Sequence, residues 1–384
     1  MKYLVIVPVL FCIVLPCIGA DEPTWIEIDN VVYGAKADNR GPIGGGKGYV
    51  NIITTGDYIV RDLDSLLDAL SKAKAGQVVF IADETAIDLT ARIYIDQLVL
   101  EISEGVTLAG NRGHGKSKGA LLTSDALKTP AMIRATGPDV RVTGLRIQGP
   151  NPKQYLDHHR RSFGQGGAGS KYYYKLPTSN GITTKYPRLE VDNCEISGFS
   201  HAGIYLVTAG GHHIHHNYIH HCQYQGLGYG VCHNTASSMI EHNLFNWNRH
   251  SIAGTGRPGN SYVARHNIEL GASLSHCFDM HGGRDRKDGT NIAGTSIDIY
   301  NNTFRARQTP VVIRGVPEEK CEVHHNWFVR HSTAGQAVKS SGKTKVFGNA
   351  YTDEPKAPSS CRHQFSDRWN FTSSRLQPLW AFGT

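Results

Sequence analysis

A short pattern of apolar and polar positions, apolar-x-x-Asn-x-apolar, recurs along most of the chain. Short β-branched runs and Gly-rich turns follow it, without the spacing of apolar positions that marks a helix. The residues in the Asn slot are Cys194, Asn217, Asn243, Asn267, Asn302, Asn326 and Asn349. Successive members are 23, 26, 24, 35, 24 and 23 residues apart. So regular a period predicts a parallel β-helix in which each repeat is one coil of three short strands.

The asparagine slot has a physical role in such a coil. We expect each asparagine to take a left-handed backbone bend between two strands, and its amide to hydrogen-bond the asparagine of the next coil. Leucine-rich repeats share the period but require a leucine spacing and a helix that the sequence lacks. An antiparallel sandwich would not keep so constant an interval.

Three further segments complete the expected domain. Residues 62–73 carry apolar residues at the spacing of an amphipathic helix, which we expect to cap the N-terminal end of the coils. Residues 142–147 resemble another coil, and an excursion over about residues 149–181 follows them. The repeat ends after Asn349, so residues 351–384 are expected to be a tail. The prediction is one domain over residues 21–384, with a cap over about 21–90 and coils over about 91–350.

Composition and charge narrow the class of protein. With 40% hydrophobic and 19% charged residues, the chain of 384 residues is expected to be globular rather than disordered. Its formal charge of +7 favours an anionic partner, and the absence of basic blocks argues against nucleic acid. An acidic polymer is the expected partner. Nothing in the sequence indicates an oligomer, and a monomer is expected.

The first twenty residues have the layout of a secretory signal, with an apolar run after Lys2 and a small residue, Ala20, before the expected cut. We therefore expect a secreted or periplasmic protein that leaves the membrane once the signal is removed. Six cysteines remain in the mature chain, and their even number leaves open whether they form bridges or stay free thiols. They are Cys194, Cys222, Cys232, Cys277, Cys321 and Cys361.

The chain resembles the pectate-lyase-like superfamily over roughly residues 26–350. The resemblance rests on Val32–Ala35, on Asp62–Leu70 running into Val78–Ile81, on Val106–Gly110, and on the asparagine coils. It implies an all-β fold, a single-stranded right-handed parallel β-helix. Because the superfamily includes polysaccharide lyases, glycosidases, epimerases and non-catalytic adhesins, it does not name the reaction. The calcium-binding carboxylates and catalytic arginine of pectate lyases are not found.

Aligning the strands that follow each asparagine on their glycines predicts two columns of polar side chains, with about 4.8 Å between neighbours. The first column is His201, Tyr224, His250 and His276, and the second is Tyr229, Thr255, His281 and Arg314. The 35-residue interval adds a basic loop over residues 283–290, beside His281. With the earlier excursion it would form a groove for an anionic glycan. Its expected substrate-binding residues are Arg284, Arg286, Lys287, Tyr224, His201, Arg160 and Arg161.

Twelve of the 20 histidines lie between His212 and His281. Adjacent histidines on a strand point to opposite faces and cannot act together, so we expect the pairs here to be outward ladder and turn residues. These pairs are His212/His213, His215/His216 and His220/His221. The residues before three successive asparagines, His216, His242 and His266, are expected to form a surface stack. The predicted catalytic residues are His250, His276, His281, Tyr229 and Arg314.

Several chemistries fit these residues. For β-elimination of a uronate, Arg314 or Arg284 would neutralise the carboxylate, His250 or His281 would be the base, and Tyr229 or Tyr224 the acid. Hydrolysis would need two carboxylates, for which only Asp279 and Asp285 are near, and whether Asp279 faces the core stays open.

Three further readings stay open. A metal-assisted lyase would use His250 and His276 with Asp279 or His281, so a divalent metal such as calcium stays open as a cofactor. A non-catalytic carbohydrate-binding or adhesion protein would use the same residues only to hold glycan. Lys339 is a reserve base, because Val338–Gly342 resembles strands of alginate and chondroitin lyases of this fold. The function predicted is a secreted lyase that cleaves an acidic, uronate-containing polysaccharide by β-elimination.

Overall fold

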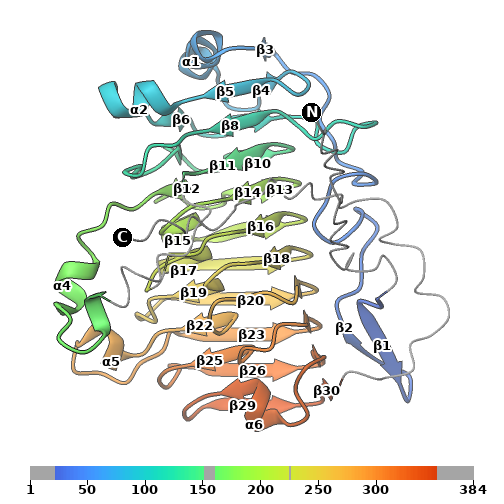
Figure 1. Ribbon diagram of the computed structural model, residues 1–384. Coiled ribbons are helices and arrows are strands. Elements are labelled where there is room, and N and C mark those ends of the chain that lie inside the picture. Colours follow the sequence, from blue (N-terminus) through green and yellow to red (C-terminus); the bar gives the residue numbers. More distant parts are fainter. Residues whose placement is uncertain (1–21, 151–160, 225, 353–384) are drawn as a thin grey trace, which may run out of the picture. The chain divides into compact units, whose positions relative to one another are not determined.

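The computed structural model describes residues 22–150, 161–224 and 226–352. The expected signal segment, Arg160, Cys361 and the tail beyond Thr352 lie outside these residues. Short strands stacked in parallel register build a right-handed parallel β-helix, as predicted (Figure 1). From Asn180 onward each coil passes in turn through three faces, which we name A, B and C.

Face A carries the strands that come first in each coil. Two long strands, β15 (Ala202–His215) and β17 (Tyr229–Glu241), begin on face A and continue onto face B. The other strands of face A are β6 (Leu100–Ile102), β9 (Ile133–Ala135), β12 (Asn180–Thr184), β19 (His250–Gly254), β22 (Phe278–Met280), β25 (Val311–Ile313) and β28 (Val338–Lys339).

Faces B and C complete each coil. Besides the ends of β15 and β17, face B contains β3 (Tyr58–Val60), β4 (Val78–Ile81), β7 (Thr107–Ala109), β10 (Arg141–Thr143), β13 (Glu190–Asp192), β20 (Ser261–Arg265), β23 (Ser296–Tyr300), β26 (Lys320–His324) and β29 (Thr344–Phe347). Face C contains β5 (Ala86–Asp88), β8 (Leu121–Thr123), β11 (Arg146–Gln148), β14 (Glu195–Ser197), β16 (Tyr218–His220), β18 (Leu244–Asn246), β21 (Ile268–Glu269), β24 (Thr303–Phe304), β27 (Trp327–Phe328) and β30 (Ala350–Tyr351).

The core lies inside the coils and is made of side chains at matching positions of successive strands. On face A, Ile204, Val231, Ile252 and Phe278 are neighbours in register and have no exposed surface. Because side chains alternate along a strand, the residues between them point outward. Burying each aliphatic or aromatic side chain contributes about 1.5–3 kcal/mol to folding. The stacked coils are therefore stabilised mainly by this core.

The asparagine slot forms a ladder at the corner between faces B and C. The Nδ2 atom of Asn243 donates to Oδ1 of Asn267 at 3.0 Å, and the same contact joins each asparagine from Asn217 to Asn349 to the next. The predicted ladder is confirmed. The prediction that the asparagine takes the bend is wrong, because the residue before it is left-handed, as at His242 with a φ of 53°.

The N-terminal end of the coils is covered by α1 (Leu63–Lys72), in agreement with the predicted capping helix. Asp62 caps this helix by accepting a hydrogen bond from the Ser65 backbone at 2.8 Å. Leu66, Ala69 and Leu70 face inward and join the main core. A second short helix, α2 (Thr90–Asp96), follows.

The segment before α1 does not belong to this cap. Its hairpin of β1 (Trp25–Ile28) and β2 (Val31–Gly34) packs on Trp327, at the other end of the coils (Figure 1). Residues 36–50, which we name the N-terminal strap, then run back along the corner beside the asparagine ladder. The approach is so close that a Cβ atom on Gly45 would lie 2.3 Å from the backbone oxygen of His216.

Two further observations concern the described residues. The sequence left open whether the cysteines form disulfide bridges. The five cysteines among the described residues form none and are buried free thiols: Cys194, Cys222, Cys232, Cys277 and Cys321. None of their helices has the length and apolar character that crossing a membrane requires.

Candidate functional site

The outward surface of face A carries one cluster of charged and titratable side chains, centred on Asp279. Asp279 lies between the core residues Phe278 and Met280 on β22, so its side chain points away from the core. It nevertheless has no exposed surface, because neighbouring polar side chains enclose it. This settles the direction of Asp279, which the sequence left open.

Three side chains hold the Asp279 carboxylate. Arg314 donates to it through Nε and Nη2 at 2.9 and 2.8 Å. The Nε2 atoms of His276 and His281 lie 3.0 and 2.8 Å from its two oxygens. Burial alone would raise the pKa of this carboxyl, but the charges and hydrogen bonds of the two histidines hold the pKa well below its usual range. Asp279 is therefore a permanently charged anchor.

His250 and Tyr229 lie beside the two histidines. The ring of His250 lies 3.9 Å from that of His276, and its Nδ1 atom is 2.6 Å from the His276 backbone oxygen. Burial lowers the pKa of His250 well below its usual value, which keeps the ring neutral. Tyr229 stacks on His250 at 5.8 Å and meets His281 edge-on at 6.5 Å. Burial raises the pKa of Tyr229, so its hydroxyl stays protonated.

The two predicted columns are partly wrong. In the observed register Tyr229 pairs with His250, so it belongs to the first column and not beside Thr255. Ala202 pairs with Tyr229, which leaves His201 and Tyr224 in the turns before their strands. The predicted columns come from aligning the segments on their glycines, and the choice between Gly226, Gly228 and Gly230 changes which residue is paired with His250. The shift still leaves His250, His276, His281, Tyr229 and Arg314 together.

The basic loop beside His281 begins with α5 (Gly283–Arg286). Arg286 bonds within the loop and to the coil, donating to Asp288 at 2.6 Å and to the Thr255 backbone oxygen at 2.8 Å. Arg284 and Lys287 are exposed. The loop thus presents two cations to solvent and uses the third to hold its own shape.

The remaining predicted substrate-binding residues have different surroundings. Tyr224 is fully buried beneath Tyr173 of α4 (Gly169–Tyr173), with ring centroids 5.0 Å apart, and donates to the Tyr173 backbone oxygen. His201 is 2.7 Å from Asn180 Oδ1, and burial lowers its pKa to about 4. Arg161 is exposed, and Arg160 is outside the described residues.

Two further candidates of the sequence lie in or near the cluster. One ligand atom each of His250, His276 and Asp279 lies within 4.8 Å of the others, so these residues could hold a metal ion. Arg314, however, already occupies both oxygens of Asp279. Lys339 lies in the same outward column as Asp279, two coils further on, and is exposed.

The histidines of faces B and C correct two predictions. His216, His242 and His266 do stack, with ring centroids 5.0 Å apart, but they lie under the N-terminal strap rather than on the surface. The adjacent histidines His215 and His216 touch through their Nδ1 atoms at 3.0 Å. Their rings meet because the second histidine takes the left-handed bend, which breaks the alternation of a strand. His220 and His221 touch in the same way.

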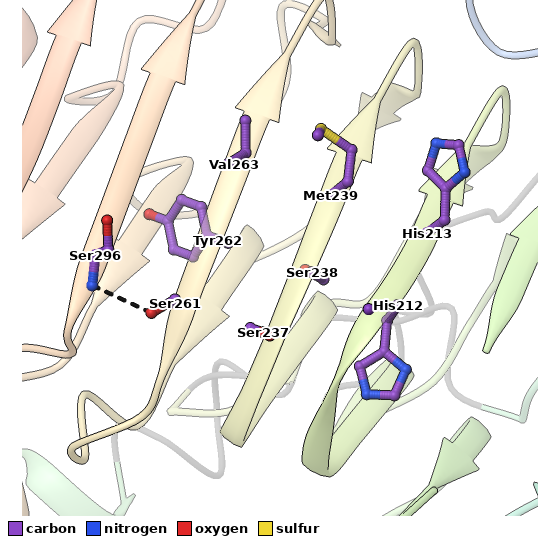
Figure 2. A pocket seen from close by; sticks show the side chains of 10 residues that line it. His212, His213, Ser237, Ser238, Met239, Ser261, Tyr262, Val263 and Ser296 are labelled. Atoms are coloured by element: carbon purple, nitrogen blue, oxygen red, sulfur yellow. Dashed lines mark hydrogen bonds between the residues drawn. The ribbon is translucent and has the colours of Figure 1, made fainter. Parts of the chain in front are cut away.

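Face B also has a shallow pocket of about 360 Å³ (Figure 2). Three serines at matching strand positions, Ser237, Ser261 and Ser296, line one side of it, and His213 and Met239 lie on the other. It lies on another face from the Asp279 cluster. Small side chains and few charged groups give this pocket no evident chemistry of its own.

One family model agrees with the fold, and two solved structures show a distant likeness. A family model described as a right handed beta helix region matches residues 155–268. A crystal structure of alginate lyase from Paenibacillus sp. str. FPU-7 has 13% sequence identity and a TM-score of 0.45, over 77% of this chain and 97% of that chain. A Yersinia enterocolitica Family 28 exopolygalacturonase has 12% identity and a TM-score of 0.41, over 79% and 64%. Comparison with curated proteins gives no match. By its own strand order, and by the family model over residues 155–268, the chain is a right-handed parallel β-helix protein.

Proposed function

We propose that the protein is a secreted or periplasmic polysaccharide lyase that cleaves an acidic, uronate-containing polysaccharide by β-elimination at the Asp279 cluster. The observation that carries the proposal is the Asp279 carboxylate, which is enclosed, charged, and in contact with two histidines on an outward surface. A carboxylate in this position fixes the orientation of an imidazole and stabilises its protonated form, as a general base requires.

His281 is the base in this proposal. Its Nε2 atom faces Asp279, and its side chain is 23% exposed, so the ring can reach a bound polymer. His250 has no exposed surface and is left with a supporting role beside His276. The base takes the proton from C5 of the uronate, and the electron pair of that bond forms the C4–C5 double bond as the C4–O bond breaks.

Tyr229 is the acid, and the exposed cations of the loop bind the uronate carboxylate. Tyr229 is 5% exposed and its hydroxyl donates to the Gly226 backbone oxygen at 3.3 Å, so it must turn from that oxygen to pass its proton to the departing one. Its ring lies beside His281. Arg284 and Lys287 are exposed cations of the loop that follows His281. Arg314 is the positioning residue, because its guanidinium is committed to Asp279 and Asp285.

The same geometry argues against hydrolysis at this site. Glycoside hydrolysis requires two carboxyl groups that both reach the sugar. Asp279 is enclosed and neutralised by Arg314, and Asp285 lies 3.3 Å from the same guanidinium. Neither carboxyl can readily serve as the proton donor at the glycosidic oxygen.

The test is the ultraviolet absorbance of unsaturated uronate, with alginate, pectate, glucuronan, ulvan and glycosaminoglycans as substrates. We expect one polymer to give a rising absorbance. New reducing ends without absorbance would mean hydrolysis, and binding without turnover would mean a carbohydrate-binding protein; either result overturns the proposal.

A matched pair of variants locates the site. His281→Gln should lower turnover by at least about 100-fold, because general-base catalysis contributes about 10²–10⁴-fold. His324→Gln is the control, since His324 on face B is similarly exposed and lies 3.2 Å from Asp298. Equal losses in the two variants would show that the effect is not local to the Asp279 cluster.

A further inference from the structure

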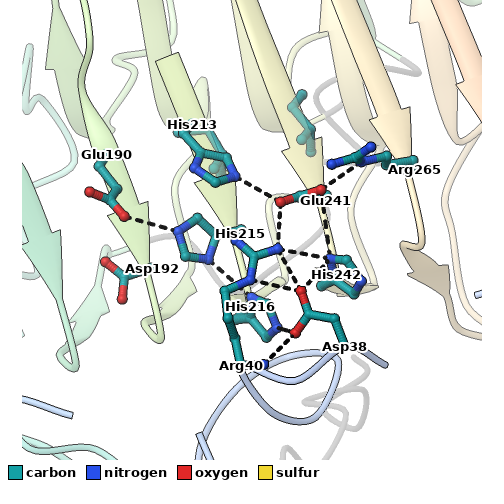
Figure 3. Close-up of polar contacts among 12 residues, drawn as sticks. Asp38, Arg40, Glu190, Asp192, His213, His215, His216, Glu241, His242 and Arg265 are labelled. Carbon is teal, nitrogen blue, oxygen red and sulfur yellow. Dashed lines mark hydrogen bonds and ion pairs between the residues drawn. The ribbon is translucent and has the colours of Figure 1, made fainter. Parts of the chain in front are cut away.

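A second cluster of histidines and carboxylates lies on the outward surface of face B. We name it the His213 cluster, and it consists of Glu190, His213, His215 and Glu241. Glu190 Oε1 is 3.1 Å from Nε2 of His215, and Glu241 Oε1 is 2.9 Å from Nε2 of His213. Figure 3 shows the two histidines between the two carboxylates.

The register of three neighbouring strands builds this cluster. Glu190 on β13 pairs with His213 on β15, and His215 on β15 pairs with Glu241 on β17. The four residues therefore occupy two adjacent outward columns of the sheet. A ring nitrogen of each histidine and a carboxylate oxygen of Glu190 all lie within 4.8 Å of one another.

A chain of contacts behind the cluster fixes the ring of His215. Nε2 of His216 lies 3.2 Å from Asp38 Oδ1, and the Nδ1 atoms of His216 and His215 lie 3.0 Å apart. Because Nδ1 of His215 is engaged in this way, its Nε2 atom is the one that points to Glu190 Oε1, at 3.1 Å.

The surrounding charges leave room for a cation. The carboxylates of the network are those of Asp38, Glu190, Asp192 and Glu241. Three guanidinium groups meet them: Arg141 binds Asp192 through two hydrogen bonds, Arg265 binds Glu241, and Arg40 binds Asp38 and Glu241. Arg141 also lies 3.8 Å from Glu190, so three guanidinium groups face four carboxylates, and one negative charge is left over for a cation.

We propose that Glu190, His213 and His215 bind a divalent transition-metal ion. Two imidazoles and one carboxylate are the ligand types that zinc and its neighbours prefer, and three protein ligands leave a position open to solvent. His213 and Glu190 are 33% and 40% exposed, so an ion can enter from solvent. Glu241 and the His216–Asp38 chain orient the two histidines from behind, as outer carboxylates do at metal sites.

The ion would connect the coils to the N-terminal strap. His216 and Asp38 join the proposed ligand His215 to the strap through two direct contacts. A neighbouring set, Asp38, His216 and His242, also lies within ligand distance, but Arg40 already donates to Asp38 there at 2.7 Å. The His213 cluster is thus the better site of the two.

A second histidine pair provides a matched control. His324 Nε2 lies 3.2 Å from Asp298, and its Nδ1 lies 2.8 Å from that of His325, which repeats the geometry of His215, Glu190 and His216. The position equivalent to His213 is Glu322, which forms an ion pair with Lys320 at 2.8 Å. The group around His324 therefore lacks a histidine in the place of His213, and we expect it not to bind the metal ion.

The experiment is a calorimetric titration of the untagged, chelator-treated protein with Zn²⁺. We expect a bound ion whose affinity falls at least about 100-fold in His213→Gln and in Glu190→Gln. Glu241→Gln, an outer residue, should lose about 10-fold. His324→Gln should bind as the unchanged protein does. Circular dichroism of each variant would establish that it folds.

Three outcomes would overturn the proposal. If the unchanged protein binds no Zn²⁺, the His213 cluster is a network of hydrogen bonds and ion pairs and not a metal site. If His250→Gln abolishes binding while His213→Gln does not, the ion belongs to the Asp279 cluster. If His324→Gln weakens Zn²⁺ binding as much as His213→Gln does, His213 is not a specific ligand of the ion. A rise in melting temperature with added Zn²⁺, lost only in variants of the His213 cluster, is the supporting result.

Discussion

Asp279 and Glu269 are carboxyl groups of two successive coils, and neither has any exposed surface, yet Asp279 is charged and Glu269 is neutral. Asp279 points outward from face A into the side chains of Arg314, His276 and His281. Glu269 occupies an inward position of face C, between Phe245 and Phe304 in adjacent strands. Burial raises the pKa of Glu269 to about 8, with only a smaller opposing effect of the Ser251 side chain.

Asp279 and Glu269 are equally buried, so burial alone does not decide whether a carboxyl of this fold is charged. The cations and hydrogen-bond donors around it decide that. Removing a carboxylate from water costs several kcal/mol, and the group becomes neutral unless cations and hydrogen bonds offset that cost. Face A supplies such partners to Asp279, whereas the core beside Phe245 supplies almost none to Glu269. Asp279 is therefore charged because outward positions of successive coils bring Arg314, His276 and His281 to it.

The largest expected effect comes from removing Arg314, the partner of Asp279 that is charged at every pH. Arg314→Met should lower the free energy of unfolding by about 3–5 kcal/mol, because it leaves the buried carboxylate without its guanidinium partner. The pKa of Asp279 should rise, so that this group becomes more like Glu269. Urea unfolding measures the stability, and turnover on the active polymer should fall by at least about 100-fold.

Arg134→Met is the matched control for this variant. Arg134 pairs with Glu101 at 3.0 Å in the same outward column of face A, but both side chains are largely exposed. Such a pair contributes at most about 1 kcal/mol. If the two variants lost equal stability, burial of Asp279 would not be the reason why its ion pair with Arg314 contributes more to the free energy of unfolding than an exposed pair does.

The second prediction concerns the pH dependence that Glu269 imposes. Its folded pKa is raised, so the unfolded chain releases this proton first, and stability falls as the pH rises from about 4.5 to about 8. The loss from this group is about 5 kcal/mol over that range, at about 1.4 kcal/mol for each pH unit. Glu269→Gln should remove this loss, and urea unfolding at pH 5, 7 and 9 would measure it.

Glu195→Gln should show the opposite sign. Contacts with His220 lower the pKa of Glu195 to about 2, against the opposing effect of burial. Glu195 therefore contributes stability that is present above about pH 4.5 and is lost as the pH falls toward 2. The Gln variant should be the less stable one at neutral pH. If stability fell with rising pH as steeply in the Glu269→Gln protein as in the unchanged chain, a group other than Glu269 would be responsible for that fall.

Much of the fold could be predicted from the sequence because the repeat is a local signal. Each asparagine recurs at nearly the same interval, and a ladder needs no more than that interval to form. The path of the N-terminal strap could not be predicted. Its contacts, such as that between Asp38 and His216, join residues far apart in the sequence, and no periodic pattern links them.

The candidate site was predicted as a group but not in its internal order. His250, His276, His281, Tyr229 and Arg314 do lie together, because all follow from the coil alignment. The anchoring role of Asp279 could not be predicted, because it depends on a contact with Arg314 of the next coil. Its outward direction could have been predicted from the alternation of Phe278, Asp279 and Met280.

A smaller effect is expected from removing one histidine of the Asp279 cluster. His276→Gln leaves Arg314 and His281 in contact with the carboxylate, so stability should fall by about 1.5–3 kcal/mol, the scale of one hydrogen bond to a charged group. Urea unfolding would measure it. A loss as large as that of Arg314→Met would mean that the imidazole, and not the guanidinium, is the main partner.

The smallest effect is expected at the other carboxylate that touches Arg314. Asp285 lies 3.3 Å from Nη1 of that guanidinium, accepts a hydrogen bond from the Gly282 backbone at 3.2 Å, and is 34% exposed. Asp285→Asn should lower stability by less than about 1 kcal/mol, and the difference should shrink in 1 M salt because exposed charges are screened. Turnover and urea unfolding at low and high salt check this. If Asp285→Asn were as damaging as Arg314→Met, the loop carboxylate would be the counter-charge of Arg314, and the contrast between Asp279 and Glu269 would lose its physical basis.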